Sequence, residues 1–229
     1  MRRGGGGQRM TRLLIIVIAA AVLVLLVAQL VLPRIAASRI SSRVGRYGSV
    51  ESVSVRAWPA VELLWGSADS VSVRAHRLSL SPSEAAKLIW EARGVESLQF
   101  AARSVQVGPM RLGDARVHKQ GSSLGAEAVI GEANVRAALP KGLAVKLVDS
   151  EGGTIRVTAS GGPFGVGPAV QALAAAQEGK LVVRPGGFLL RGLTLTLFSD
   201  PHVYVEGVGA SVRPGSPRSY RLTMRAHLR

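Results

Sequence analysis

The segment Leu13–Leu32 constrains this chain more than any other, because it holds twenty residues of which only Gln29 is polar. In a helix that rises about 1.5 Å per residue, such a segment crosses a hydrocarbon core of roughly 30 Å. Lipid offers no partners to backbone N–H and C=O groups, so a spanning segment must satisfy them within a helix. The sequence therefore predicts a transmembrane anchor over residues 13–32.

The residues on either side of this segment predict its orientation. Four arginines and no acidic residue lie in the tail 1–12. By the positive-inside rule, such a basic flank stays in the cytoplasm. We therefore expect a single-pass protein of the cell inner membrane, with a cytoplasmic tail and with everything after Pro33 outside the cytoplasm.

A cleaved signal peptide is the alternative interpretation, because a positive start followed by apolar residues fits both. The apolar stretch is longer than the roughly 7–15 residues of an ordinary signal core. Ile35-Ala36-Ala37 is a poor match to a cleavage site. These two observations favour a retained anchor, and either interpretation takes the domain out of the cytoplasm.

The charge of the exported part indicates its partners. The formal net charge is +15, and +11 remains once the four arginines of the tail are removed. A basic chain often binds nucleic acid, but this domain is expected to face away from the cytoplasm, where anionic lipid headgroups are the natural countercharge. Aromatic residues make up only 4% of the chain, which leaves few platforms for stacking on bases. A general role in solubility is the alternative explanation.

The absence of cysteine excludes two kinds of chemistry. With no thiol in the chain, cysteine catalysis and cysteine-ligated metal sites are impossible. An exported domain without disulfides must be stabilised by packing alone, so we expect an extensive core.

Residues 34–46 are predicted to form a juxtamembrane helix. Ile35, Ile40 and Val44 alternate with arginines at helical spacing. Two interpretations remain open at this point. The helix lies on anionic headgroups, or it is the first helix of the domain with a solvated basic face.

Residues 47–229 are expected to form one exported domain. Alternation of apolar and polar residues predicts strands, and runs that follow proline or serine and end at glycine predict short helices. The expected strands cover residues 53–57, 71–80, 98–107, 110–119, 124–130, 143–148, 154–159, 180–184, 193–198, 202–212 and 219–228. The expected helices cover 59–65, 83–93 and 132–139, whereas 163–178 is ambiguous. The fold class is α+β, with a long curved, mostly antiparallel sheet packed on a few helices.

A search for catalytic motifs yields no candidate. The four histidines lack paired ligand spacing, and there is no nucleophile elbow or phosphate-binding loop. The aspartates lie next to turn signals, where they are common for backbone reasons. The sequence therefore predicts a protein that is not an enzyme and that has no catalytic residue, metal or cofactor. An unrecognised enzyme of glycans or lipids would need carboxylates or histidines that converge in space.

Two apolar clusters on the expected short helices are candidates for a lipid-binding groove. Core packing is the more common role of such residues. A groove is the functional alternative, because each buried CH₂ contributes roughly 0.8 kcal/mol to the capture of an acyl chain. Arg56 and Arg74 are candidates to pair with a lipid phosphate, although they equally suit solvated strand positions. The candidates for acyl-chain contact are Trp58, Leu63, Leu64, Trp65, Leu88 and Ile89.

The order of these features resembles the LmeA-like family of actinobacterial phospholipid-binding proteins. The resemblance rests on an anchor and a basic helix followed by the segments 50–66, 66–74, 179–185 and 203–208, and it covers most of residues 34–229. The helix Ser83–Arg93 departs from the family pattern.

This resemblance implies a periplasmic, membrane-anchored protein that binds phospholipid during assembly of the cell envelope. It also implies a curved sheet wrapped on helices, similar to lipid-carrying tubular domains. The expected partners are therefore phospholipid, with anionic headgroups preferred, and the membrane. A non-catalytic envelope scaffold that binds a protein through an apolar patch is the alternative. A retained anchor favours local capture or hand-off of lipid over long-range shuttling.

Overall fold

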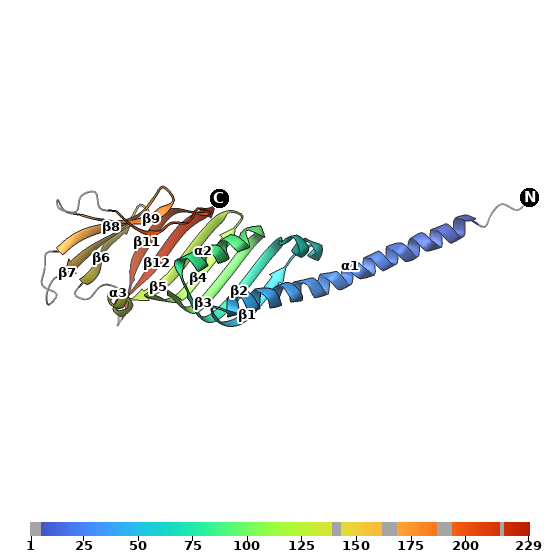
Figure 1. Cartoon of the computed structure of the whole chain (residues 1–229), viewed down its shortest axis with the longest axis horizontal. Coiled ribbons are helices and arrows are strands. Elements are labelled where there is room, and N and C mark those ends of the chain that lie inside the picture. The colour runs from blue at the N-terminus through green and yellow to red at the C-terminus, as the bar shows by residue number, and fades with distance from the viewer. Residues whose placement is uncertain (1–5, 139–142, 162–168, 187–193, 216–217) are drawn as a thin grey trace, which may run out of the picture.

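The computed structural model describes residues 6–138, 143–161, 169–186, 194–215 and 218–229, with the side chains of the first helix described from residue 21. A long helix leaves one end of an elongated domain, in which two β-sheets follow one another (Figure 1). This architecture is the α+β arrangement that the sequence predicted.

The long helix is α1 (Gly6–Gly45), and it is continuous through Pro33. Proline cannot donate the helical hydrogen bond to the carbonyl group of Gln29, yet the helix does not end there. The predicted anchor 13–32 and juxtamembrane helix 34–46 are thus parts of one helix. Ala36, Ala37, Ile40 and Val44 pack against the domain. These contacts are those of the first helix of the domain.

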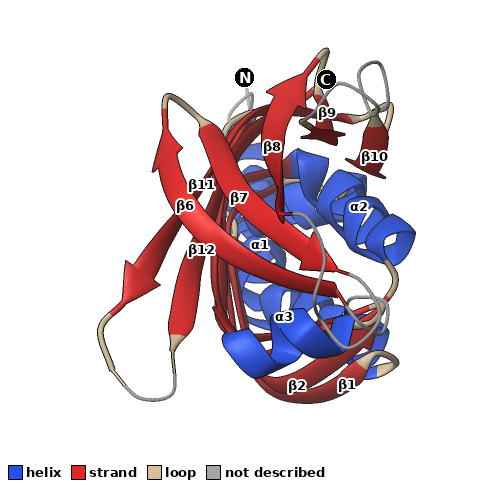
Figure 2. Cartoon of the chain, turned by 90° about the vertical axis from the view of Figure 1, so that its left-hand side faces the viewer, coloured by secondary structure: helices blue, strands red, loops and turns tan. Residues whose placement is uncertain are grey.

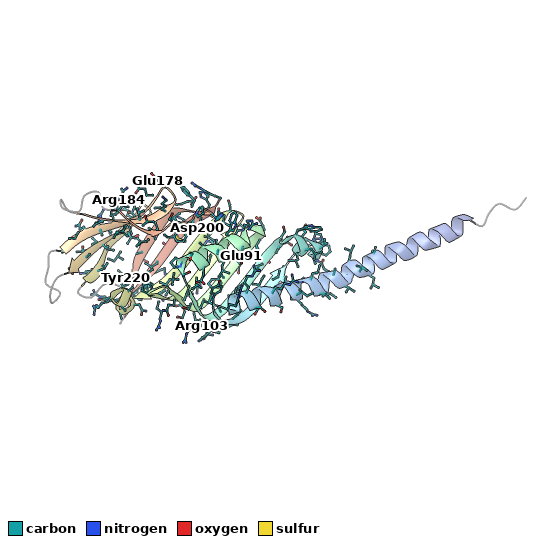
Figure 3. All side chains as sticks on the ribbon, in the orientation of Figure 1. Glu91, Arg103, Glu178, Arg184, Asp200 and Tyr220 are labelled. Atoms are coloured by element: carbon teal, nitrogen blue, oxygen red, sulfur yellow. The ribbon has the colours of Figure 1, made fainter. Side chains whose placement is uncertain are left out.

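The described N-terminal part of α1 is exposed. The stretch Ala21–Gly45 is long and apolar enough to cross a membrane, and its most apolar window has a mean hydropathy of 2.1 and no buried residues. Figure 3 shows the described side chains of this part projecting clear of the domain. A helix of this kind near the N-terminus is compatible with a membrane anchor or a signal sequence.

The larger sheet has seven strands in the order β1-β2-β3-β4-β5-β12-β11. Neighbouring strands are antiparallel except β2 and β3, which are parallel because a helix crosses between them. The strand bounds are β1 Gly48–Arg56, β2 Ala68–Leu80, β3 Val95–Val107, β4 Met110–Gln120, β5 Ser123–Gly131, β11 Val203–Arg213 and β12 Ser219–Leu228.

The predicted short helices are present. A 3₁₀-helix, η1 (Ala60–Trp65), connects β1 to β2 and ends at Gly66, whose φ of 79° is in the left-handed region that glycine favours. The crossover from β2 to β3 contains α2 (Pro82–Glu91) and η2 (Ala92–Gly94). Ser81 caps α2 in a reciprocal capping box with Glu84. The short helix α3 (Glu132–Ala138) follows β5.

The second sheet has five strands in the order β10-β9-β8-β7-β6, so the one sheet expected from sequence is two. Its strands are β6 Leu143–Glu151, β7 Thr154–Gly161, β8 Ala169–Gln177, β9 Lys180–Pro185 and β10 Leu195–Phe198. The ambiguous stretch 163–178 contains strand β8, while residues 162–168 lie outside the described residues. Pairing with β7 and β9 overrides the helical propensity of the alanines in β8.

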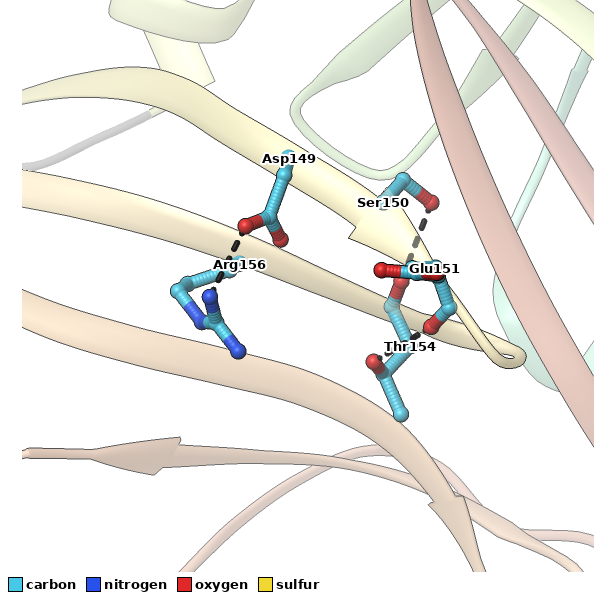
Figure 4. A network of polar contacts seen from close by, with 5 residues as sticks. All are labelled: Asp149, Ser150, Glu151, Thr154 and Arg156. Carbon is cyan, nitrogen blue, oxygen red and sulfur yellow. Dashed lines mark hydrogen bonds and ion pairs between the residues drawn. The ribbon is translucent and has the colours of Figure 1, made fainter.

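The two sheets meet along β11. The backbone N–H of Ala210 in β11 donates to Oγ of Ser150 at 2.9 Å. The same hydroxyl group donates to the carbonyl oxygen of Thr154 at 2.9 Å, across the end of the β6–β7 hairpin (Figure 4). Backbone hydrogen bonds from Val205 and Val208 to the second sheet complete the junction. The hairpin is therefore tied to the larger sheet by satisfied polar groups rather than by a shared ladder.

Helices lie on one face of the larger sheet, within its curve (Figure 2). We call this the inner face and the opposite one the outer face. The register of neighbouring strands places one apolar residue from each strand in a continuous row across the inner face. That row consists of Val53, Val73, Phe100, Val117, Ala126, Met224 and Val208.

Candidate functional site

The inner face is a continuous apolar surface that the helices cover in parts. The C-terminal third of α1 covers it over β1 to β3, where Ile40 and Val44 pack near Val71 and Val73. Farther along the sheet, Ala126 on β5 and Met224 on β12 remain half-buried in the apolar row. An extended apolar face with half-buried positions is suited to contact with acyl chains.

The first predicted cluster is mostly turned outward. Trp58, Leu64 and Trp65 are 75%, 66% and 74% exposed. Leu63 alone among the cluster's four residues is half-buried and packs beside the core of β1 and β2. The structure therefore leaves three of these four side chains on the surface, with Leu64 and Trp65 on η1 and Trp58 just before it.

The second predicted cluster, on α2, packs inward. Ile89 contacts a core formed by Leu124, Val203 and Ala226, and Leu88 is half-buried. The neighbouring Trp90 ring lies with its centroid 4.1 Å from that of His202. The two predicted clusters thus belong to different parts of the domain, and the structure does not bring them together.

The two predicted headgroup residues lie on the outer face. Arg56 and Arg74 are exposed and alternate with buried Val55 and Val73, so they point away from the helices. Arg74 lines a shallow hollow of about 180 Å³ around Ala101 on this face. The hollow is also lined by acidic and basic side chains, namely Glu51, Asp114, Arg103 and Arg116.

A larger cavity, of about 270 Å³, lies where β2 and β3 begin and β4 ends. We call it the rim cavity. The ends of η1 and η2 approach closely here, since a side chain at Gly94 would collide with the carbonyl oxygen of Gly66. Its polar lining consists of Glu62, Ser67, Asp69, Arg93, Glu96 and Lys119.

Lys119 is the residue that sequence reasoning missed. It is 2% exposed and lies two residues after Val117 in β4, so both side chains point to the inner face. Its ammonium group donates to the backbone carbonyl oxygens of Arg93 and Val95. Burial lowers the pKa of Lys119, and the negative charge of Glu96 partly opposes that shift. The sequence signal that could have identified it is a lysine at a strand position where the alternating pattern otherwise places apolar residues.

Three of the four histidines, His76, His202 and His227, each lie beside a different carboxylate. His227 lies 2.8 Å from Glu206, and His202 lies 3.3 Å from Asp200. Over the part of the chain that the structure describes, no group of three histidines or carboxylates could hold a metal ion. The expectation of a non-catalytic protein stays a prediction.

A curved sheet whose apolar face is partly covered by helices, attached to an exposed apolar helix, is the architecture of a protein that can hold an amphipathic ligand. Residues 24–225 match the sequence pattern of the LmeA-like phospholipid-binding family, so this chain belongs to that family. The resemblance predicted from sequence is thereby confirmed, and family membership supports phospholipid binding. No curated protein and no solved structure matches the chain.

Proposed function

We propose that this chain is a membrane-anchored, extracytoplasmic phospholipid-binding protein that captures or hands off lipid during cell-envelope assembly. The observation that carries the proposal is the apolar inner face, which crosses all seven strands of the larger sheet beneath α1 and α2. Membership of a phospholipid-binding family supports the same function.

In this proposal the anchor is retained, with the basic tail in the cytoplasm and the domain in the periplasm. The helix supports this arrangement because its last third packs on the sheet. Cleavage near Ala37 would remove part of α1, including residues that contact the core. An anchored domain samples only the lipid within its reach, which favours local capture or hand-off.

The geometry supports one orientation for the bound lipid. The acyl chains lie along the half-buried centre of the inner face, near Val117, Ala126 and Met224. The headgroup lies at the rim cavity, where Arg93 and Lys119 can meet its phosphate and the carboxylates of Glu62, Asp69 and Glu96 can meet a cationic group. Lys119 lies two residues beyond Val117 on the same face of β4. Arginine suits phosphate recognition through its forked donors. The net charge of the exported part favours anionic lipids.

The test is a matched pair of tryptophan substitutions on the two faces of one sheet. Ala126 lies on the inner face between Val117 and Met224, and Ala101 lies on the outer face between Arg74 and Arg116. Both alanines are half-buried. The full chain is purified in detergent, and the phospholipid that co-purifies is measured by extraction and mass spectrometry.

We expect Ala126→Trp to lose most of the co-purified phospholipid, because the indole ring fills the space of the acyl chains. Ala101→Trp should retain it. Thermal unfolding of both variants controls for overpacking, which costs about 1–3 kcal/mol. Equal phospholipid in the two variants, or none in the unsubstituted chain, contradicts the proposal.

A non-catalytic envelope scaffold is a second candidate, and one observation favours it. Leu195 and Leu197 on β10 are 53% and 57% exposed at an edge of the five-stranded sheet. Exposed apolar edge strands are sites of strand pairing with partners. Site-specific photo-crosslinking from position 197 in cells would yield a discrete protein adduct if this edge is an interface, and none if it is free.

A further inference from the structure

The outward side of η1 carries an apolar patch that neither the core nor the inner face uses. Trp58, Leu64 and Trp65 lie within a segment of eight residues, and each is more than 60% exposed. Single exposed apolar residues are common, whereas a contiguous patch marks an interaction site. We call these three residues the η1 patch.

The η1 patch is attached to the membrane helix by specific hydrogen bonds. The side-chain amide of Gln29 donates to the carbonyl oxygen of Ala57 at 3.3 Å and accepts from the N–H of Ala60 at 2.7 Å. The N–H of Trp58 donates to Asp69 at 2.8 Å, which holds the start of the patch on β2. The one polar residue of the apolar run thus holds η1 against α1.

This attachment sets the depth of the patch relative to a bilayer. Gln29 lies three residues before Leu32, the last residue of the apolar run, which is about 4.5 Å along a helix. With the run in the hydrocarbon core, the patch lies at the boundary between acyl chains and headgroups. Tryptophan is enriched at this boundary because its ring is apolar and its N–H is polar.

The charges near the patch fit the same placement. Arg34 follows the apolar run after Pro33, and Arg56 ends the strand that leads into the patch. Both side chains are exposed. Arginine at the edge of an apolar segment is attracted to anionic headgroups.

We propose that the η1 patch inserts into the leaflet that α1 reaches at its C-terminal end, and that it seats the end of the domain on the bilayer. Two points of contact, α1 and η1, then hold the domain in one orientation instead of letting it swing about the anchor. The rim cavity shares Glu62 with η1, so it lies beside the membrane surface. The insertion does not require that the inner face binds lipid.

Tryptophan fluorescence tests this insertion, because the chain has three tryptophans and only two of them lie in the patch. The full chain is reconstituted in vesicles of phosphatidylglycerol and phosphatidylcholine that carry bromine near the top of the acyl chains. Trp90→Phe leaves Trp58 and Trp65 as reporters. The matched control, Trp58→Phe with Trp65→Phe, leaves Trp90 on α2.

We expect the two patch tryptophans to lose most of their fluorescence to the brominated lipid, and Trp90 to lose much less. The Trp90 signal also measures any quenching by a lipid held inside the domain. If the patch tryptophans are quenched no more than Trp90, the proposal is overturned.

A second pair of variants separates insertion from lipid binding. Gln29→Leu, in the Trp90→Phe background, removes the attachment of η1 to α1 and should reduce quenching while α1 stays in the bilayer. Ala126→Phe in the same background fills space on the inner face without adding a tryptophan, and it should keep full quenching even where it loses co-purified lipid. Unchanged quenching in Gln29→Leu would show that this attachment does not set the depth of the patch.

Discussion

The helices α2 and η1 are similar in sequence and opposite in placement. Both are short, have a proline at their start (Pro59 before η1 and Pro82 as the first residue of α2), and carry leucine and tryptophan. α2 crosses the inner face between two parallel strands, so Ile89 reaches the core. η1 joins two antiparallel neighbours at the end of the sheet, so only its Leu63 side meets the core. Topology, rather than hydrophobicity, decides which apolar cluster packs inward and which stays exposed.

The contrast between the two helices is tested most directly by shortening one apolar side chain on each and comparing the loss of stability. Ile89→Ala on α2 should destabilise the domain by about 2 kcal/mol, the lower end of the cost for a core isoleucine, because Ile89 is half-buried. Leu64→Ala on η1 should change stability by no more than about 0.5 kcal/mol. Denaturant unfolding of the full chain in detergent measures both. Equal losses would mean that η1 also packs into the fold.

Lys119→Met tests the polar attachment of η2, which follows α2. Losing the ammonium group leaves the carbonyl groups of Arg93 and Val95 without this donor, at a cost of about 1–3 kcal/mol. The substitution retains most of the aliphatic volume that packs on the inner face. A variant as stable as the unsubstituted chain at neutral pH would show that water replaces the ammonium group.

The stability difference between Lys119→Met and the unsubstituted chain should also depend on pH. Because burial lowers the pKa of Lys119, the unfolded chain binds its proton more tightly than the folded chain does. The stability of the unsubstituted chain should therefore rise, relative to Lys119→Met, as the pH increases from the lowered pKa toward 10.5. Parallel unfolding curves for the two chains over that range would contradict the burial of a charged lysine.

Ser81→Ala tests the start of α2, and η1 lacks a side-chain cap of this kind. Loss of the cap should cost about 1 kcal/mol. Hydrogen bonds from Ser81 lower the pKa of Glu84, so the capping box is complete above the ordinary value of 4.5 and weakens as the pH falls through the lowered pKa. The difference between Ser81→Ala and the unsubstituted chain should therefore shrink in acid, as measured by unfolding at several pH values.

Arg43→Gln should have the smallest effect. Arg43 on α1 pairs with Glu91 on α2 at 2.9 Å, and Figure 3 marks Glu91 beside the sheet. The pair is largely solvated, so its loss should cost about 0.2–1 kcal/mol and the cost should vanish at high salt. Unfolding at low and high ionic strength measures this, and a salt-independent loss would indicate a packing role of the arginine stem.

Local patterns predicted most elements of the fold because they depend on neighbouring residues. Alternation identified the strands of the larger sheet, and the proline, serine and glycine signals placed η1 and the start of α2 to within one residue of the expected bounds. Strand β8 stayed ambiguous because its alanines favour a helix and only its partners make it a strand. The division into two sheets depends on pairing between distant strands, which no local pattern records.

The sequence by itself determined the apolar N-terminal helix, the α+β class, the family resemblance and the absence of thiol chemistry, because each follows from composition or from local sequence patterns. The tertiary structure decided which clusters face inward, that Arg56 and Arg74 lie on the outer face, and that Lys119 is buried at the rim cavity. It also brought the start of η1 to Gln29, because the N–H of Ala60 donates to the side chain of Gln29, which lies 31 residues earlier in the chain. These outcomes rest on strand register and crossover, which bring together residues that are far apart in sequence.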